Sequence, residues 1–210
     1  HKDDKFSLKE FKTAKIIFEK QNEILLNNAT SEDVRNKILA NILYFKKINK
    51  EFNFNTRKIN YGRYLTFLIK LDYNLILVVN NIILDHKVKF RYHNGDEVKL
   101  IETLNKCGSQ RMYLQKLAFY YYIYEFISNK SALNITYVVF EENTDELLLN
   151  EFNNHRINEG LGDIMLLWLK ISENYKEFYS IEMPDIEVYN ITNKLTHKFN
   201  KLTNYYEDYQ

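Results

Sequence analysis

The sequence predicts a mainly α-helical protein: a multi-helix bundle around a buried central helix at about residues 109–128, with a small two- or three-stranded β element at about 87–92 and 135–140. Three observations lead to this class. Of the 210 residues, 45% are hydrophobic and 15% are aromatic, which is enough for a large core. There are only 5 glycines and 1 proline, which favours long helices over turn-rich β architecture.

The third observation is the segment from Met112 to Ile127, where apolar and aromatic residues occupy nearly every helical azimuth. A helix that is apolar all round is normally enclosed by others. The segment carries charge and is shorter than the about 20 apolar residues that span a membrane, so we expect a buried helix and no membrane partner. Its tyrosines bring hydroxyls that need partners when buried. We expect core packing with hydroxyls at the rim; Tyr120, Tyr122 and Tyr124 are also a candidate partner surface.

The N-terminal part of the chain predicts two helices that pair as an antiparallel hairpin. Ser7-Leu8-Lys9-Glu10 is a capping box, and a helix of about 20 residues with one apolar face follows it. Thr30 and Asp33 are the start signal of the second helix. A third helical pattern runs from Asn55 to Ile82, and a strand at 75–79 is the alternative for part of it.

The predicted β element rests on two short stretches. Residues 87–92 alternate between apolar and basic side chains and end in a turn signal, which is typical of a strand. The residues after this turn fit either a returning strand or, better, a short helix ending at Gly108. Residues 135–140 read as a second strand. The basic face of the first strand, like the wing of a winged helix, gives candidate nucleic-acid contacts at Lys87, Lys89 and Arg91.

Three further segments complete the chain. Asn143 starts a helix, and residues 153–162 are the most irregular stretch, with Asp163 as the expected cap of the next helix. The last helix opens at Pro184-Asp185. Its apolar face is a second candidate partner surface, and it includes Ile191, Leu195 and Phe199.

The domain organisation and location follow from the absence of linkers and from the cysteine content. We expect a single helical domain over residues 1–210, with a soft division near residue 85 between a helical hairpin plus long helix (1–85) and a small α+β part (86–210). Cys107 is the only cysteine, which excludes an internal disulfide and fits a reducing, cytoplasmic location.

The sequence lacks the usual signs of catalysis. With 29 basic and 28 acidic residues there is no overall field for non-specific nucleic-acid binding. The histidines show no metal-ligand spacing, so we predict no metal, no cofactor and no catalytic residue. Cys107 is expected near a helix C-terminus, where the dipole does not favour a thiolate. An enzyme with an unrecognised carboxylate site, drawn from the acids around Glu141 and Asp163, is the third hypothesis after protein binding and nucleic-acid binding.

The pattern Met112-x-Leu114-x-Lys116-Leu117-x-x-Tyr120-x-Tyr122, followed by a short strand and further helices, resembles the middle components of ABC three-component antiphage defence systems of the Lamassu type. The resemblance covers about residues 109–180. It implies a non-catalytic adaptor that joins an SMC-like ATPase to an effector such as a nuclease. The abundant apolar faces and the lack of catalytic signs favour a binding role independently, so the leading hypothesis is an accessory subunit whose partners are other protein subunits in a complex.

Overall fold

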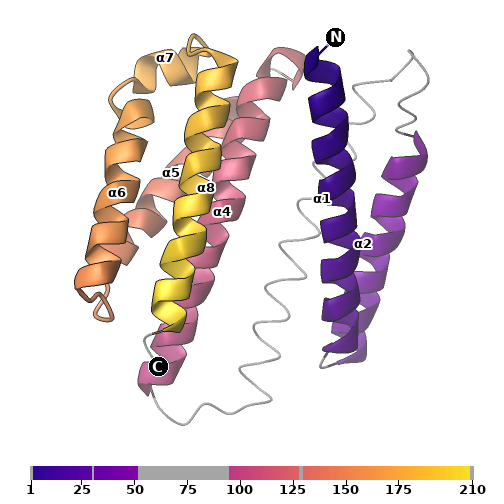
Figure 1. Ribbon diagram of the computed structural model, residues 1–210, viewed down its shortest axis with the longest axis horizontal. Coiled ribbons are helices and arrows are strands. Elements are labelled where there is room, and N and C mark those ends of the chain that lie inside the picture. Colours follow the sequence, from indigo (N-terminus) through magenta and orange to yellow (C-terminus); the bar gives the residue numbers. More distant parts are fainter. Residues whose placement is uncertain (1, 30, 52–94, 128–129, 209–210) are drawn as a thin grey trace. The chain divides into compact units, whose positions relative to one another are not determined.

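The structure, a computed structural model, describes residues 2–29, 31–51, 95–127 and 130–208. Every regular element in these ranges is a helix (Figure 1). The helices are α1 (Lys2–Asn27), α2 (Glu32–Glu51), α4 (Gly95–Ile127), α5 (Lys130–Leu148), α6 (His155–Ser172), α7 (Tyr175–Ser180) and α8 (Asp185–Glu207). The helical character that the sequence predicts is thus confirmed.

The chain divides into two compact units, residues 1–92 and 93–210. The predicted soft division near residue 85 stays a prediction, because residue 85 lies outside the described residues. In the first unit, α1 and α2 form a helical hairpin around Val34 and Ile38, and the rings of Phe18 and Phe45 pack with their centroids 4.1 Å apart. α1 begins at Lys2, ahead of the predicted capping box.

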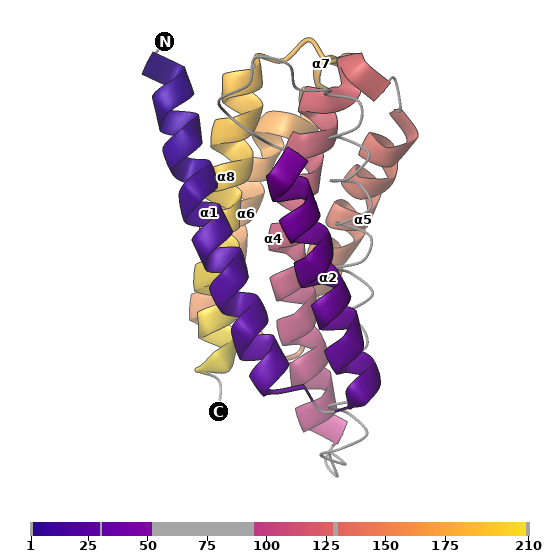
Figure 2. The same ribbon diagram turned by 90° about the vertical axis from the view of Figure 1, so that its right-hand side faces the viewer.

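The second unit is built around α4, which packs against both α8 and α5, while α6 packs against α8. Figure 2 shows α4 between α5 on one side and α8 with α6 on the other. The core of this unit combines side chains from all five helices, among them Leu114, Phe140, Trp168, Phe178 and Phe199. Within the described ranges no helix has the length and apolar character needed to cross a membrane.

The predicted β element is wrong for residues 135–140, which lie inside α5. Thr136, Tyr137 and Phe140 are buried at helical spacing, whereas Ile135 and Val138 are exposed. A strand would put alternate residues on one face, so the packing selects the helix and overrides the β preference of Ile, Val and Tyr. The helix predicted to start at Asn143 therefore already begins at Lys130. The other predicted strand, at 87–92, lies outside the described residues.

The central helix is longer than predicted, because α4 spans 33 residues and passes through Gly108 without a stop. One buried stripe explains its continuity. Its members recur at spacings of three and four residues, which keeps them on one side of a helix: Thr103, Cys107, Gln110, Leu114, Leu117 and Tyr121. The short helix predicted to end at Gly108 and the central helix predicted at about 109–128 are therefore one continuous helix, α4.

The loop predicted at 153–162 is wrong from residue 155 onward, since α6 starts at His155. The side chain of Asn154 caps it, with Oδ1 accepting a hydrogen bond from the Ile157 N–H at 2.9 Å. Gly160 lies where α6 approaches α8: a Cβ there would stand 3.3 Å from Leu202 Cδ1. Gly160 therefore serves close helix packing. Asp163 lies inside α6, where it accepts from Lys198 at 2.6 Å, instead of capping the helix.

Candidate protein-binding surfaces

The predicted tyrosine surface serves mainly to hold the second unit together. The Tyr122 hydroxyl donates to the Asp185 carbonyl at 2.7 Å, and the Tyr121 hydroxyl donates to the Met183 carbonyl at 2.6 Å. Burial, with Asp185 nearby, raises the pKa of each of these phenols to about 12. Tyr120 is half-buried against the same core. Tyr121 and Tyr122 thus fix the α7–α8 connection and the start of α8 to the C-terminal half of α4.

Tyr124 takes part in a different contact. The Lys130 ammonium lies 5.3 Å from the centroid of the Tyr124 ring and 5.2 Å from that of Tyr179. Cation–π attraction at these distances links the end of α4, the start of α5 and α7. Tyr124 is half-buried, and its ring already contacts a cation of the same chain, the Lys130 ammonium.

The three candidates on the last helix belong to the core. Ile191 is 4% exposed, and Leu195 and Phe199 are fully buried. α4 and α6 cover this face of α8 within the second unit. Ile191, Leu195 and Phe199 are therefore corrected from partner surface to core. The apolar face of α8 is packed against α4 and α6, and its polar face is the one exposed to water.

Sequence reasoning missed the apolar side chains on the outer faces of α5 and α6. Ile135 is 59% exposed and Val138 41% on α5, and Leu166 is 68% exposed and Leu169 38% on α6. We call these four side chains the outer α5–α6 surface. Each pair is spaced by three residues, as on one side of a helix, and on α5 the strand prediction for 135–140 hid this spacing.

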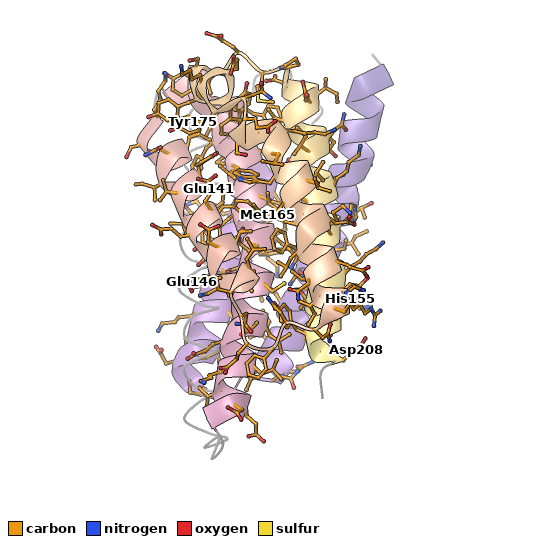
Figure 3. All side chains as sticks on the ribbon, turned by 90° about the vertical axis from the view of Figure 1, so that its left-hand side faces the viewer. Glu141, Glu146, His155, Met165, Tyr175 and Asp208 are labelled. Atoms are coloured by element: carbon orange, nitrogen blue, oxygen red, sulfur yellow. The ribbon has the colours of Figure 1, made fainter. Side chains whose placement is uncertain are left out.

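The two helices that carry this surface are joined by aromatic packing. The Trp168 indole N–H donates to Glu141 Oε1 at 3.1 Å, and the Trp168 ring packs on Tyr137 with centroids 5.2 Å apart. Figure 3 labels Glu141 on α5, Met165 on α6 and Tyr175 on α7. The two helices that carry the outer α5–α6 surface are thus packed against each other.

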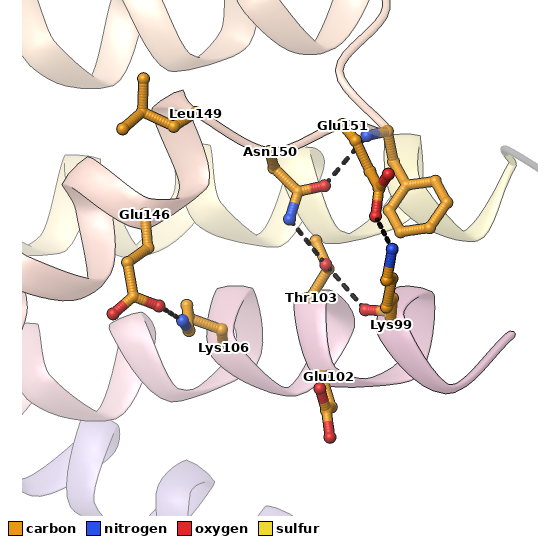
Figure 4. Close-up of a pocket in the computed structure, with 9 residues that line it drawn as sticks. Lys99, Glu102, Thr103, Lys106, Glu146, Leu149, Asn150 and Glu151 are labelled. Atoms are coloured by element: carbon orange, nitrogen blue, oxygen red, sulfur yellow. Dashed lines mark hydrogen bonds and ion pairs between the residues drawn. The ribbon is translucent and has the colours of Figure 1, made fainter. Parts of the chain in front are cut away.

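A pocket of about 450 Å³ lies between the first half of α4 and the α5–α6 connection (Figure 4). Two ion pairs join charged groups that line it: Lys99 contacts Glu151 at 2.7 Å, and Lys106 contacts Glu146. Asn150 Nδ2 donates to Thr103 Oγ1 at 2.9 Å. These contacts fasten the α5–α6 connection to α4.

In the described part of the chain, the acidic side chains of the carboxylate-site hypothesis that form ion pairs or side-chain hydrogen bonds do not converge on one point. Glu141 binds the Trp168 indole and Glu146 binds Lys106, while Asp163 pairs with Lys198 on another face. Across the described ranges, no set of three His, Cys, Asp or Glu side chains is placed to hold a metal ion. The candidate nucleic-acid contacts Lys87, Lys89 and Arg91 lie outside the described residues, so they stay a prediction.

Cys107 lies in the middle of α4 and is fully buried. Its sulfur accepts a hydrogen bond from the Thr203 hydroxyl at 3.3 Å and lies 3.7 Å from the Phe199 carbonyl, to which it donates. Burial raises the pKa of the thiol to about 11, against the smaller opposing effects of Thr203 and Arg111. Cys107 is therefore a core residue.

No family model matches the chain, and no solved structure matches it. The "Putative histone-lysine N-methyltransferase 1" of Plasmodium falciparum (isolate 3D7) is 30% identical over 156 residues, which covers 68% of this chain. The matched region is only 2% of the length of that protein.

Proposed function

We propose that the chain is a non-catalytic accessory subunit that binds other proteins in a multi-subunit complex. The observation that carries the proposal is the outer α5–α6 surface, where four large apolar side chains lie exposed on two adjacent helices. Neighbouring exposed apolar residues are typical of sites where proteins associate, and each of the two helices contributes one such pair, spaced by three residues. The fold does not need them, because the opposite faces of both helices form the core.

The complex that we propose is a Lamassu-type antiphage defence system located in the cytoplasm. In it the chain joins an SMC-like ATPase to an effector such as a nuclease. The support for this assignment is the resemblance of the Met112–Tyr122 pattern, which lies on α4. The single buried cysteine agrees with a reducing compartment.

The test is co-expression of the chain with the products of its neighbouring genes. We expect an ATPase subunit to co-purify with the unaltered chain and to be lost from the double variant Leu166→Asp, Leu169→Asp. Lys170→Asp, an exposed change on the same helix, is the matched control and should retain the partner. A chain that stays monomeric beside all its neighbours, or a double variant that binds as before, would remove this proposal.

A further inference from the structure

The solvent side of α5 carries a regular stripe that the fold leaves open. Its members follow one another at spacings of three, four, three and four residues: Ile135, Val138, Glu142, Asp145 and Leu149. All five are exposed, Leu149 to 87%. The helical turn continues to Leu149, whose N–H donates to the Asp145 carbonyl at 3.2 Å. We call this stripe the α5 seam.

The spacing of the α5 seam is that of the contact positions of a coiled coil, in which a second helix lies along the first. The seam spans 14 residue steps and is therefore about 21 Å long at 1.5 Å per residue. The opposite face of α5 is fully used by the fold, since Leu133, Phe140 and Leu147 have no exposed surface. The seam is thus the side of α5 that the core does not use.

The charge of the α5 seam is uneven along its length. Apolar residues stand at both ends, and Glu142 and Asp145 stand in the middle. The adjacent acids are engaged elsewhere, Glu141 with the Trp168 indole and Glu146 with Lys106. Within the described ranges no basic side chain forms an ion pair with Glu142 or Asp145, and α5 has no Lys or Arg after Lys130. The centre of the seam is therefore negative.

This charge pattern distinguishes two helices that could bind along the seam, that of a second copy of the chain and that of another protein. A second copy of the chain would place the acidic centre of one seam against the acidic centre of the other, whether the two helices ran parallel or antiparallel about that centre. Like charges facing each other are unfavourable. A helix with basic residues at the matching positions would instead form ion pairs there and cover the apolar ends.

We propose that the α5 seam is the docking site of one amphipathic helix of a partner protein, with apolar residues at its ends and Lys or Arg at its two central contact positions. This inference rests on the proposed function as a protein-binding subunit and names the partner element and its chemistry. Burial of Ile135, Val138 and Leu149 supplies affinity, and the paired charges fix register and partner choice.

The test uses two synthetic helical peptides and the full-length chain. Both peptides carry leucines at the outer contact positions; one has lysines and the other glutamates at the two central ones. We expect the lysine peptide to bind about tenfold more tightly at low ionic strength, the order expected when two partly exposed ion pairs replace two like-charge contacts. Fluorescence anisotropy of labelled peptides measures the affinities.

Charge reversal in the protein provides the decisive control. The double variant Glu142→Lys, Asp145→Lys should reverse the preference and bind the glutamate peptide more tightly. The double variant Glu173→Lys, Glu177→Lys makes the same change of charge at exposed positions off the seam and should keep the preference of the unaltered chain. Circular dichroism checks that each variant is folded.

Equal binding of the two peptides, or a preference unchanged by reversal at Glu142 and Asp145, would overturn the seam proposal. So would the absence of lysine-peptide binding at about 1 mM, a concentration that detects an interaction of about 4 kcal/mol. Co-purification separates this failure from that of the proposed function. If Leu166→Asp, Leu169→Asp loses the ATPase subunit while the reversed seam retains it, the subunit role stands and the seam proposal falls.

Discussion

Gln110 is a polar side chain with no exposed surface between α4 and α5. Its Nε2 donates to the Phe140 carbonyl at 2.8 Å and to Thr144 Oγ1 at 2.5 Å. Within the described structure, its Oε1 accepts no hydrogen bond. A buried acceptor without a donor costs about 1–3 kcal/mol, and this cost offsets part of the stabilisation that the two donated hydrogen bonds provide. Gln110 therefore fixes how α4 lies against α5 more than it stabilises the protein.

Gln110→Met should change the free energy of unfolding by no more than about 1 kcal/mol, because it removes both hydrogen bonds and the unsatisfied oxygen while keeping the volume. Gln110→Glu should destabilise by several kcal/mol, since it buries a carboxyl group against the Phe140 carbonyl. Urea denaturation measures both. Equal losses in the two variants would contradict this account of the site.

The burial of Cys107 makes a prediction about thiol reactivity. A rise in pKa from 9.0 to about 11 lowers the thiolate fraction near pH 8 about 100-fold, and burial blocks the reagent as well. The native protein should therefore react with a thiol reagent at least about 100-fold more slowly than the denatured protein. Absorbance of the released aromatic thiol follows the reaction. Rapid labelling in the native state would show that α4 opens readily at Cys107.

At the scale of single helices, α6 contains two glycines that the sequence pattern assigned to or next to a loop. The sequence around Gly160 and Gly162 reads as a loop, yet both residues lie within α6. Their surroundings differ: a Cβ at Gly160 would meet Leu202 at 3.3 Å, and a Cβ at Gly162 would meet nothing within 4 Å. One glycine permits the approach of α8, and the other only lowers helix propensity.

Gly162→Ala should stabilise the protein by about 0.5–1 kcal/mol, the usual gain for alanine over glycine inside a helix. Gly160→Ala should give a smaller gain, and Gly160→Leu should destabilise by about 1–3 kcal/mol through overpacking against Leu202 and Tyr205. Thermal unfolding of the three variants measures the order. A stabilising Gly160→Leu would mean that α6 and α8 are farther apart than described.

The helical state of α5 is tested by a neighbouring pair of residues. Leu133→Ala should cost about 2–5 kcal/mol because Leu133 is fully buried. Ile135→Ala should be neutral or slightly stabilising, because Ile135 is 59% exposed and alanine is the better helix former. If the predicted strand at 135–140 extended back to Leu133, the two side chains would share a face and the two losses would be similar. Denaturant titrations distinguish the two patterns.

At the scale of the whole molecule, the second unit encloses phenol and thiol groups in its core. Burial raises the pKa of Tyr121, Tyr122 and Cys107, and also those of Tyr137 and Tyr206. The native state thus holds these groups in their protonated forms to higher pH than the unfolded state does. This difference links the stability of the protein to alkaline pH.

These groups contribute their full stabilisation below about pH 9, and stability should fall between about pH 9 and 12, because the unfolded chain releases these protons first. Melting temperatures across this range measure the fall. Tyr122→Phe removes one titrating hydroxyl, so the alkaline loss should be smaller in this variant even though its bond to the Asp185 carbonyl is gone. A melting temperature independent of pH would contradict the burial of these groups.

Part of the candidate site could be read from the sequence, and part could not. The tyrosines of the central helix were expected to pack with hydroxyls at the rim, and Tyr121 and Tyr122 do bond backbone carbonyls. Ile191, Leu195 and Phe199 were assigned to a surface because their helix has one polar face, but α4 and α6 cover the apolar one. Ile135 and Val138 were not predicted as surface residues, because their β-branched side chains favoured a strand at 135–140.

Composition and helical periodicity by themselves determined that the chain is helical, with a buried helix near its centre and a final helix opening at Pro184. These features depend on the spacing of residues within one segment. Only the tertiary structure decided that α4 runs through Gly108, that residues 135–140 are helical and that the α5 seam faces solvent. The physical reason is that local preferences there are weak or opposed, so contacts with distant segments determine the conformation and the exposed face.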